Sequence, residues 1–322
     1  MTSAGRRTWI ALLALVLVDA WVVPGFLHVT WVDGALRGMP IDILEHGARV
    51  ALVAVGAALV VASGGVDLGI GAVMAISATV AARITIASGS PVLAIAAALA
   101  AGGLAGFLNA IFVVRAGMPP IVATLIPMVA GRGVAQLLGR GEILALDVPW
   151  AIALGSGACL GVPWGVWVAG GTIALVAAVV RRTPLGAGLA ATGSNAAACH
   201  VAGVPVGQLK TLAYITCSVL AAVAGLLAAA DIRAADAHNV GLFAELDAVV
   251  AVVLGGTAIT GGRFSLQGAI AGGLFLETLT VTLHALGVRS DVAPLPKALV
   301  VLAAALLARP GAIDQLLRRR SA

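Results

Sequence analysis

The sequence has little charge and almost no lysine. Only 10% of its 322 residues are charged, whereas 61% are hydrophobic, and its mean hydropathy is +1.10. A soluble domain needs far more charge to cover its surface, so the composition excludes a soluble fold and is typical of a membrane protein. Because a helix needs about 20 apolar residues to cross the hydrocarbon, a chain of this length has room for about ten crossings.

The motifs of several enzyme classes are also missing. No G-x-x-x-x-G-K-[ST] loop occurs and the only lysines are Lys210 and Lys297, so we expect this chain not to bind ATP. It has no nucleophile elbow or zinc-protease motif. The three cysteines form no C-x-x-C pair and the five histidines never recur at metal-ligand spacing, so we expect no disulfide, metal or other cofactor. Acids inside apolar segments are too few for a proton relay: Asp19, Asp67, Asp247 and Glu277.

Ten apolar segments predict an all-α integral membrane fold, with one transmembrane domain over residues 1–322. The sixth segment is too long for one crossing, and we expect a break near Gly161–Pro163; the eighth and tenth are short. The segments are 8–24, 46–63, 68–86, 91–114, 119–138, 150–180, 210–230, 246–259, 265–286 and 295–308.

The basic residues indicate the orientation of these segments. With the N-terminus in the cytoplasm, eleven basic residues fall on the cytoplasmic side and five in the outer loops, and this positive-inside asymmetry places both termini in the cytoplasm. Because the charges are spread along a hydrophobic chain, the net charge of +5 does not indicate nucleic-acid binding. The inner set is Arg6, Arg7, Arg115, Arg181, Arg182, Lys210, Arg263, Arg309, Arg318, Arg319 and Arg320, and the outer set is Arg37, Arg83, Arg140, Arg233 and Arg289.

Two glycine-rich stretches interrupt the apolar pattern, one in each half of the chain. The first, Ser63–Gly71, contains Asp67, whose carboxylate needs a partner because a charge at mid-membrane costs about 2.5–3.5 kcal/mol. Asp67 can cap the helix that begins at Leu68, or belong to a broken helix that lines a substrate path, and the two interpretations are compatible. The second stretch, Gly255–Ser265, can be a flexible turn or the counterpart of the first in an internal repeat.

The longest inner loop, residues 181–209, points to a cytoplasmic partner. Thr183–Pro184 stops the preceding helix, and Ser194 or Asn195 can cap a short alanine-rich helix that ends near Gly203. An exposed helix with small side chains and little charge is suited to fill a groove on another protein.

Several motifs in the same order resemble the permease family that serves ribose, xylose, galactose and related sugars in bacterial ABC importers. The resemblance covers nearly the whole chain, and two stretches, Pro40–Gly56 and Ala229–Ala248, are most similar to the permease of the galactofuranose importer. The chain departs from the family at Ala196–Ala198, where relatives often carry a charged residue. The motifs are GGVDLGIGAVMA (Gly64–Ala75), GFLNAIFVVRAGMPPIVATL (Gly106–Leu125), GRG (Gly131–Gly133), RTPLGAGLAATGSNAAACHVAGV (Arg182–Val204) and ELDAVVAVVLGGTAITGG (Glu245–Gly262).

The resemblance implies a multi-pass permease of the bacterial inner membrane that translocates a monosaccharide by alternating access and has no enzyme activity. The sugar that the resemblance implies is galactofuranose, a ribose-like pentose or a related sugar. The implied partners are a cytoplasmic ABC ATPase subunit, a periplasmic sugar-binding protein, surrounding membrane lipid, and a second permease that is either the same chain or a related one. The alternative is a secondary sugar transporter without an ATPase, which would need coupling-ion ligands or a proton relay.

Three groups of candidate site residues follow. Asn109 and Thr124 can equally be interhelical hydrogen-bond partners, worth about 0.6 kcal/mol each, and the acids of the outer loop 231–245 can equally be ordinary solvated residues. The ATPase-coupling group is Gly193, Ser194, Asn195, Ala198 and Gly203; the substrate-pathway group is Asp67, Asn109, Thr124, Arg132 and Glu277; and the receptor-docking group is Asp231, Arg233, Asp236, Asn239 and Glu245.

Overall fold

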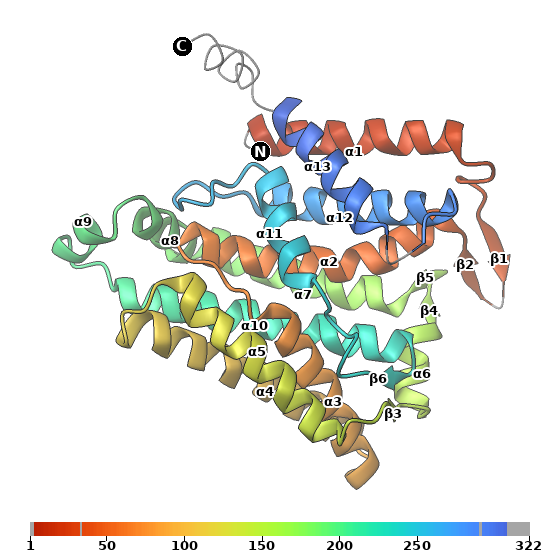
Figure 1. The fold of residues 1–322 in the computed structure, drawn as a ribbon, viewed down its shortest axis with the longest axis horizontal. Helices are drawn as coiled ribbons and strands as arrows, with labels where there is room; N and C mark the ends of the chain where they lie inside the picture. Colours follow the sequence, from red (N-terminus) through yellow and green to blue (C-terminus); the bar gives the residue numbers. More distant parts are fainter. Residues whose placement is uncertain (1–2, 33, 290–291, 308–322) are drawn as a thin grey trace.

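The chain folds into long helices that run roughly side by side, with short strand pairs in the connecting loops (Figure 1). The computed structural model describes residues 3–32, 34–289 and 292–307. The long helices are α1 (Ser3–Val22), α2 (Met39–Ala62), α3 (Ile70–Ser88), α4 (Pro91–Ala110) with the π-helical turn η1 (Ile111–Arg115), α5 (Pro120–Gly139), α7 (Trp164–Arg182), α10 (Val206–Asp231) and α12 (Leu266–Ala285). The shorter helices are α6 (Pro149–Ser156), α8 (Leu185–Ser194), α9 (Ala196–Val201), α11 (Ala244–Leu254) and α13 (Pro294–Leu307).

Local signals in the sequence set several helix ends. The side chain of Ser90 accepts from the backbone N–H of Leu93 at the start of α4, and that of Ser265 accepts from Gly268 at the start of α12. Both satisfy N–H groups that have no partner inside the helix. The end of α3 at Gly89 has φ of +65°, the left-handed conformation that glycine adopts most easily.

Among the described residues, seven helices are long and apolar enough to cross a membrane. They overlap seven of the ten predicted segments, although α2 begins seven residues before the second segment and α7 covers only the later part of the sixth. The predicted break in the sixth segment is confirmed, because α6 and α7 are separated by a short hairpin. The other three predicted crossings fall on α1, which carries Arg6, Arg7 and Asp19, and on the short helices α11 and α13. The last predicted segment ends at residue 308, outside the described residues. The seven helices span Met39–Ala62, Ile70–Ser88, Pro91–Arg115, Pro120–Gly139, Trp164–Arg182, Val206–Asp231 and Leu266–Ala285.

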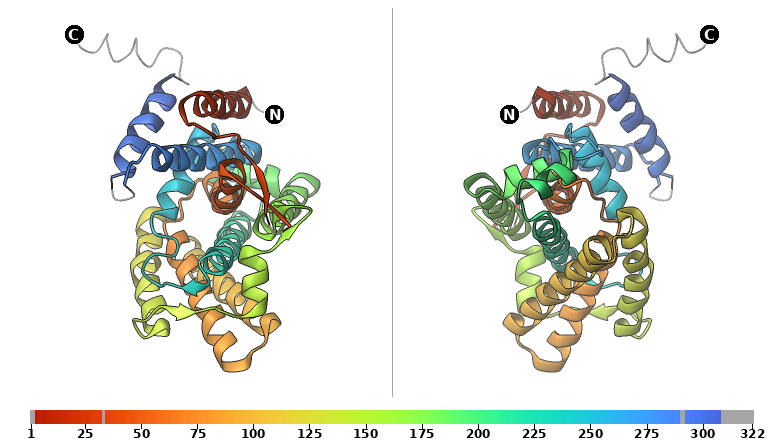
Figure 2. Two further views of the ribbon diagram at one scale, coloured as in Figure 1. Left: turned by 90° about the vertical axis from the view of Figure 1, so that its right-hand side faces the viewer. Right: turned by 90° about the vertical axis from the view of Figure 1, so that its left-hand side faces the viewer.

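The centre of the bundle is α2, whose residues from Ala51 to Ala62 are all buried. It packs against α10, α12, α11 and α7, and the end-on views in Figure 2 show it surrounded by other helices. A second group is formed by α3, α4, α5 and α10. Glycines let α4 and α10 approach closely: a Cβ on Gly106 would lie 2.6 Å from the backbone oxygen of Tyr214, and one on Gly102 would lie 2.6 Å from the Cβ of Ala222.

The strand pairs gather at the end of the bundle opposite α8 and α9 (Figure 1). They tie the loops there to one another: the N–H of Leu36, in the α1–α2 loop, donates to the carbonyl of Gly161 in the α6–α7 loop, at 2.8 Å. The loop after α5 likewise pairs with the loop after α10. The pairs are β1 (Thr30–Val32) with β2 (Ala35–Arg37), β3 (Leu144–Ala145) with β6 (Ala234–Ala235), and β4 (Ala158–Cys159) with β5 (Val162–Pro163).

Candidate functional site

The first glycine-rich break separates α2 from α3, and Asp67 lies buried within it. Its Oδ1 accepts from the backbone N–H of Gly69, the residue before α3, at 2.9 Å, and from Nδ2 of Asn109 on α4 at 3.1 Å. Among the described residues, Oδ2 has no nitrogen or oxygen partner, and the weakly polar thiol of Cys217 lies beside the carboxylate. Because α3 begins at Ile70 and not at Leu68, the carboxylate closes the turn ahead of the helix, does not cap its first turn, and ties the break to α4.

Side chains from two further helices hold the same segment. Thr124 Oγ1, on α5, accepts from the N–H of Leu68 at 3.1 Å and donates to its own helix at Pro120. Tyr214 on α10 donates to the carbonyl oxygen of Val66 at 3.2 Å. A break in a membrane helix leaves backbone groups without helical partners, and in an apolar medium these groups need substitutes. Thr124 and Tyr214 supply them.

The second break, between α11 and α12, lies against the first. The N–H of Gly262 donates to the carbonyl oxygen of Ala62, the last residue of α2, at 3.1 Å. Gly261 has φ of +90°, and a Cβ there would lie 2.8 Å from Cα of Gly64. The two interruptions, almost 200 residues apart in the sequence, are therefore in direct backbone contact.

The end of α8 completes this contact. A Cβ on Gly193 would overlap both the carbonyl oxygen of Ala62 and the backbone nitrogen of Gly262, so only glycine fits. Ser194, which follows Gly193, also takes part in the contact, because a Cβ on Gly262 would lie 2.8 Å from Oγ of Ser194. We call this contact the glycine junction; it comprises residues 62–64, 193–194 and 260–262.

The short helix predicted in the inner loop is present as α9, directly after the glycine junction. Asn195 is the cap: its Oδ1 accepts from the N–H of Ala198 at 2.9 Å. Ala198 is exposed, Val201 is 89% exposed, and Gly203 has φ of +76° where the chain turns toward α10. With α8, α9 protrudes at the end of the bundle away from the strand pairs (Figure 1).

At the opposite end, Asp236 organises the loop between α10 and α11. Its carboxylate accepts from the N–H of His238 at 2.9 Å, the N–H of Asn239 at 3.2 Å and Nδ2 of Asn239 at 2.6 Å. Burial alone raises the pKa of Asp236, but these hydrogen bonds to the charged form outweigh burial and hold its pKa below the ordinary value. The carboxylate is thus ionised and engaged within its own loop.

Arg132, predicted to face a substrate path, reaches this loop from α5. Its guanidinium donates to the carbonyl oxygens of Val240 at 2.6 Å, Ala237 at 3.2 Å and Gly241 at 3.3 Å. Glu245, expected on the outer surface, is only 4% exposed; it begins α11 and lies beside Gly71 and Arg132. The structure therefore brings together one residue predicted to line the substrate path and one predicted to dock the receptor.

The other outer-loop residues also contact neighbouring elements. Asp231 ends α10 and accepts from Nη1 of Arg49 on α2 at 2.9 Å. Arg233 donates to Oγ of Ser156, at the end of α6, at 2.9 Å. The predicted docking surface is thus part of the structural framework of this end.

Sequence reasoning missed a group of charges between α2, α11, α12 and α13. Nζ of Lys297 lies 2.8 Å from Oδ1 of Asp247, and half-buried Glu277 lies near this ion pair and near Arg49. The sequence does indicate that these charges need partners, since each of the three residues lies inside or next to an apolar segment. The pairing could not be read from the sequence, because Asp247 and Lys297 are 50 residues apart.

Comparison with known proteins places this architecture in a family. Residues 39–308 match the family model described as branched-chain amino acid transport system / permease component. The chain is 44% identical to the galactofuranose transporter permease protein YtfT of Escherichia coli K12, over 92% of this chain and 87% of the relative. It is 34% identical to the fructose import permease FruF of Bifidobacterium longum (95% and 88% covered) and 33% identical to the ribose import permease RbsC of E. coli K12 (94% and 92%). No solved structure matches it.

Proposed function

Because the chain belongs to this permease family, whose members similar to it include sugar permeases, we propose that it is the membrane-spanning subunit of an ATP-binding-cassette importer for a monosaccharide. The observation that carries the proposal is the glycine junction. It connects the protruding pair α8–α9, which suits a cytoplasmic partner, directly to both breaks in the transmembrane helices. A permease that is driven by a separate cytoplasmic ATPase subunit needs such a connection.

The proposed topology has ten crossings within one transmembrane domain over residues 1–322. It adds α1, α11 and α13 to the seven long apolar helices and places both termini, with the loop 181–209, in the cytoplasm. The loop 231–245 then lies on the periplasmic side. At 11 residues, α11 extends about 16 Å, so the helix itself covers only part of its crossing and adjoining residues complete it.

In the proposed mechanism, ATP binding closes two partner ATPase subunits against α9 and moves α8. Since Gly193 touches the ends of both breaks, this movement shifts them and exchanges outward and inward openings. The permease supplies the passage and its coupling, and the partner supplies hydrolysis. A second permease, identical or related, completes the pore, and a periplasmic sugar-binding protein delivers the sugar at the outer loop.

Galactofuranose and ribose-like pentoses are the sugars to test first. Among the proposed pathway residues, Asp67, Asn109, Thr124 and Arg132 all hydrogen-bond to protein groups, and these bonds hold the broken segment and the outer loop. Glu277 makes no direct hydrogen bond among the described residues. Its carboxylate is therefore the proposed pathway group with the most freedom to meet a sugar hydroxyl.

The test is reconstitution in proteoliposomes. The chain alone should neither hydrolyse ATP nor accumulate sugar, and adding its ATPase and binding protein should give ATP-dependent uptake. Sugar accumulation by the chain alone, driven by an ion gradient, would establish the alternative, a secondary transporter. ATP turnover by the isolated chain would contradict both.

A further inference from the structure

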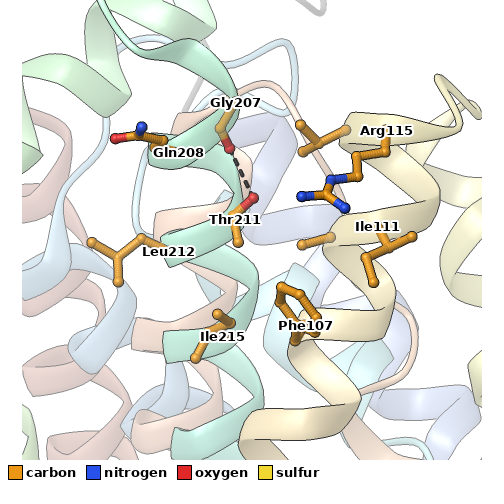
Figure 3. A pocket seen from close by; sticks show the side chains of 10 residues that line it. Phe107, Ile111, Arg115, Gly207, Gln208, Thr211, Leu212 and Ile215 are labelled. Carbon is orange, nitrogen blue, oxygen red and sulfur yellow. Dashed lines mark hydrogen bonds between the residues drawn. The ribbon is translucent and has the colours of Figure 1, made fainter.

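A groove of about 540 Å³ runs between α4–η1 and α10, away from the glycine junction and the outer loop. Its lower walls in Figure 3 are apolar, formed by Phe107 and Ile111 on one side and Ile215 on the other. Phe107 is 42% exposed and the neighbouring Leu212 is 43% exposed. Both belong to helices that can span a membrane, so this part of the groove opens toward acyl chains.

The other end of the groove is polar. Arg115 is the last residue of η1, where this span ends, and its guanidinium points into the space between the two helices (Figure 3). Gln208 also lines the groove from α10, but its amide points away from Arg115 (Figure 3). Among the described residues the Arg115 side chain makes no hydrogen bond or ion pair, so its N–H groups are available to an anion.

The local backbone supports a binding role. In η1 the N–H of Ala116 donates to the carbonyl oxygen of Ile111 at 3.0 Å, the wider i to i+5 pattern of a π-helix. Single π-helical turns inside α-helices occur frequently at functional sites.

We propose that this groove binds an anionic phospholipid of the cytoplasmic leaflet. One acyl chain lies against Phe107, Ile111 and Ile215, and the phosphate accepts from Arg115. A free anion would leave the apolar half unused, and a neutral lipid would leave the guanidinium without a counter-charge. The choice of leaflet rests on the proposed topology, which places Arg115 on the cytoplasmic side.

Lipid retention by the full-length chain tests the proposal. The purified protein is incorporated in nanodiscs of phosphatidylcholine with about one fifth phosphatidylglycerol, and bound lipids are counted by native mass spectrometry. Wild type should retain phosphatidylglycerol preferentially, and Arg115→Gln should lower that preference about five-fold. Arg115→Lys should keep most of it. The matched control is Arg182→Gln, which removes an exposed charge at the end of α7 outside the groove.

A second variant probes the apolar half. Thr211→Phe places a ring among the lining residues and should reduce retention of both lipids. Equal retention of the two lipids by wild type, or wild-type preference in Arg115→Gln, overturns the proposal. Displacement of the lipid by inorganic phosphate alone would identify a free-anion site, and efficient disulfide cross-linking of Leu212→Cys to itself would show that a second copy covers the groove. Because no step measures uptake or ATP hydrolysis, failure here is distinguishable from failure of the proposed function.

Discussion

Gly193 at the end of α8 lies directly on the carbonyl oxygen of Ala62 at the end of α2, with no room for a methyl group between them. The end of α8 and the end of α2 therefore meet through main-chain atoms alone. Replacing Gly193 by alanine, which adds a single carbon atom, therefore tests whether this contact transmits movement.

Gly193→Ala should reduce sugar uptake more than ATP hydrolysis in the assembled importer. The added Cβ forces α8 away from the two breaks, at a cost of about 1–3 kcal/mol in local packing. The measurement is the number of sugars transported per ATP hydrolysed. Gly170→Ala is the control, because a Cβ there has no heavy atom within 4 Å and alanine favours the helix. An unchanged ratio in Gly193→Ala would show that the junction does not transmit movement.

Ala198→Arg should abolish uptake while leaving the chain inserted. Ala198 is exposed on α9, and only its backbone takes part in the Asn195 cap, so the side chain is free for a partner's groove. A guanidinium in a groove built for a methyl group creates a clash and a desolvated charge. Ala198→Ser, which stays small, is the matched control. If the arginine variant transports normally, α9 does not enter a groove.

Asp236→Lys should slow receptor-stimulated ATPase activity, most clearly at low salt where screening is weak. Because Asp236 also caps its loop, Asp236→Asn separates charge from shape by keeping a side-chain oxygen for the same N–H groups. If docking depends on charge, both variants are impaired; if it depends on loop shape, only the lysine variant is. Superimposable rate curves for wild type and both variants at two ionic strengths would exclude Asp236 from docking.

The lowered pKa of Asp236 predicts a pH dependence. A carboxyl with a lower pKa in the folded state stabilises the fold above its unfolded pKa, and this stabilisation is lost as the pH falls through the folded pKa. The melting-temperature difference between wild type and Asp236→Asn in detergent should therefore be constant above about pH 5 and shrink below about pH 4. A difference that persists at pH 3 would show that the carboxylate charge contributes nothing.

Lys297→Met and Asp247→Leu should each destabilise the protein by about 2 kcal/mol, because each leaves a charge without its partner in a half-buried site. The double variant should be less destabilised than the sum of the two. Thermal unfolding of all four forms, as a double-mutant cycle, measures the coupling between α11 and α13. Additive effects would mean that the ion pair contributes no interaction energy.

The sequence predicts the helices well because the apolar runs and their caps are local. Seven crossings, the interruption before Trp164 and the Asn195 cap all follow from neighbouring residues. The position of Glu245 does not: the local sequence predicts a polar loop, but Glu245 lies in the first turn of α11 and points toward Gly71. The glycine junction cannot be predicted from the sequence either, since nothing in the composition indicates that Gly64, Gly193 and Gly262 meet.

The loops at the end of the bundle where the strand pairs gather are joined to one another by backbone hydrogen bonds. Leu36 bonds to Gly161, and β3 pairs with β6. When another protein binds one of these loops, the backbone hydrogen bonds therefore transmit the force to several helices. The α5–α6 and α10–α11 loops share one strand pair, so a force on either reaches α5 and α10 together. Such stiffness suits the proposed docking of a sugar-binding protein on these loops. The larger displacements would then occur at the opposite end of the bundle, which carries α8 and α9.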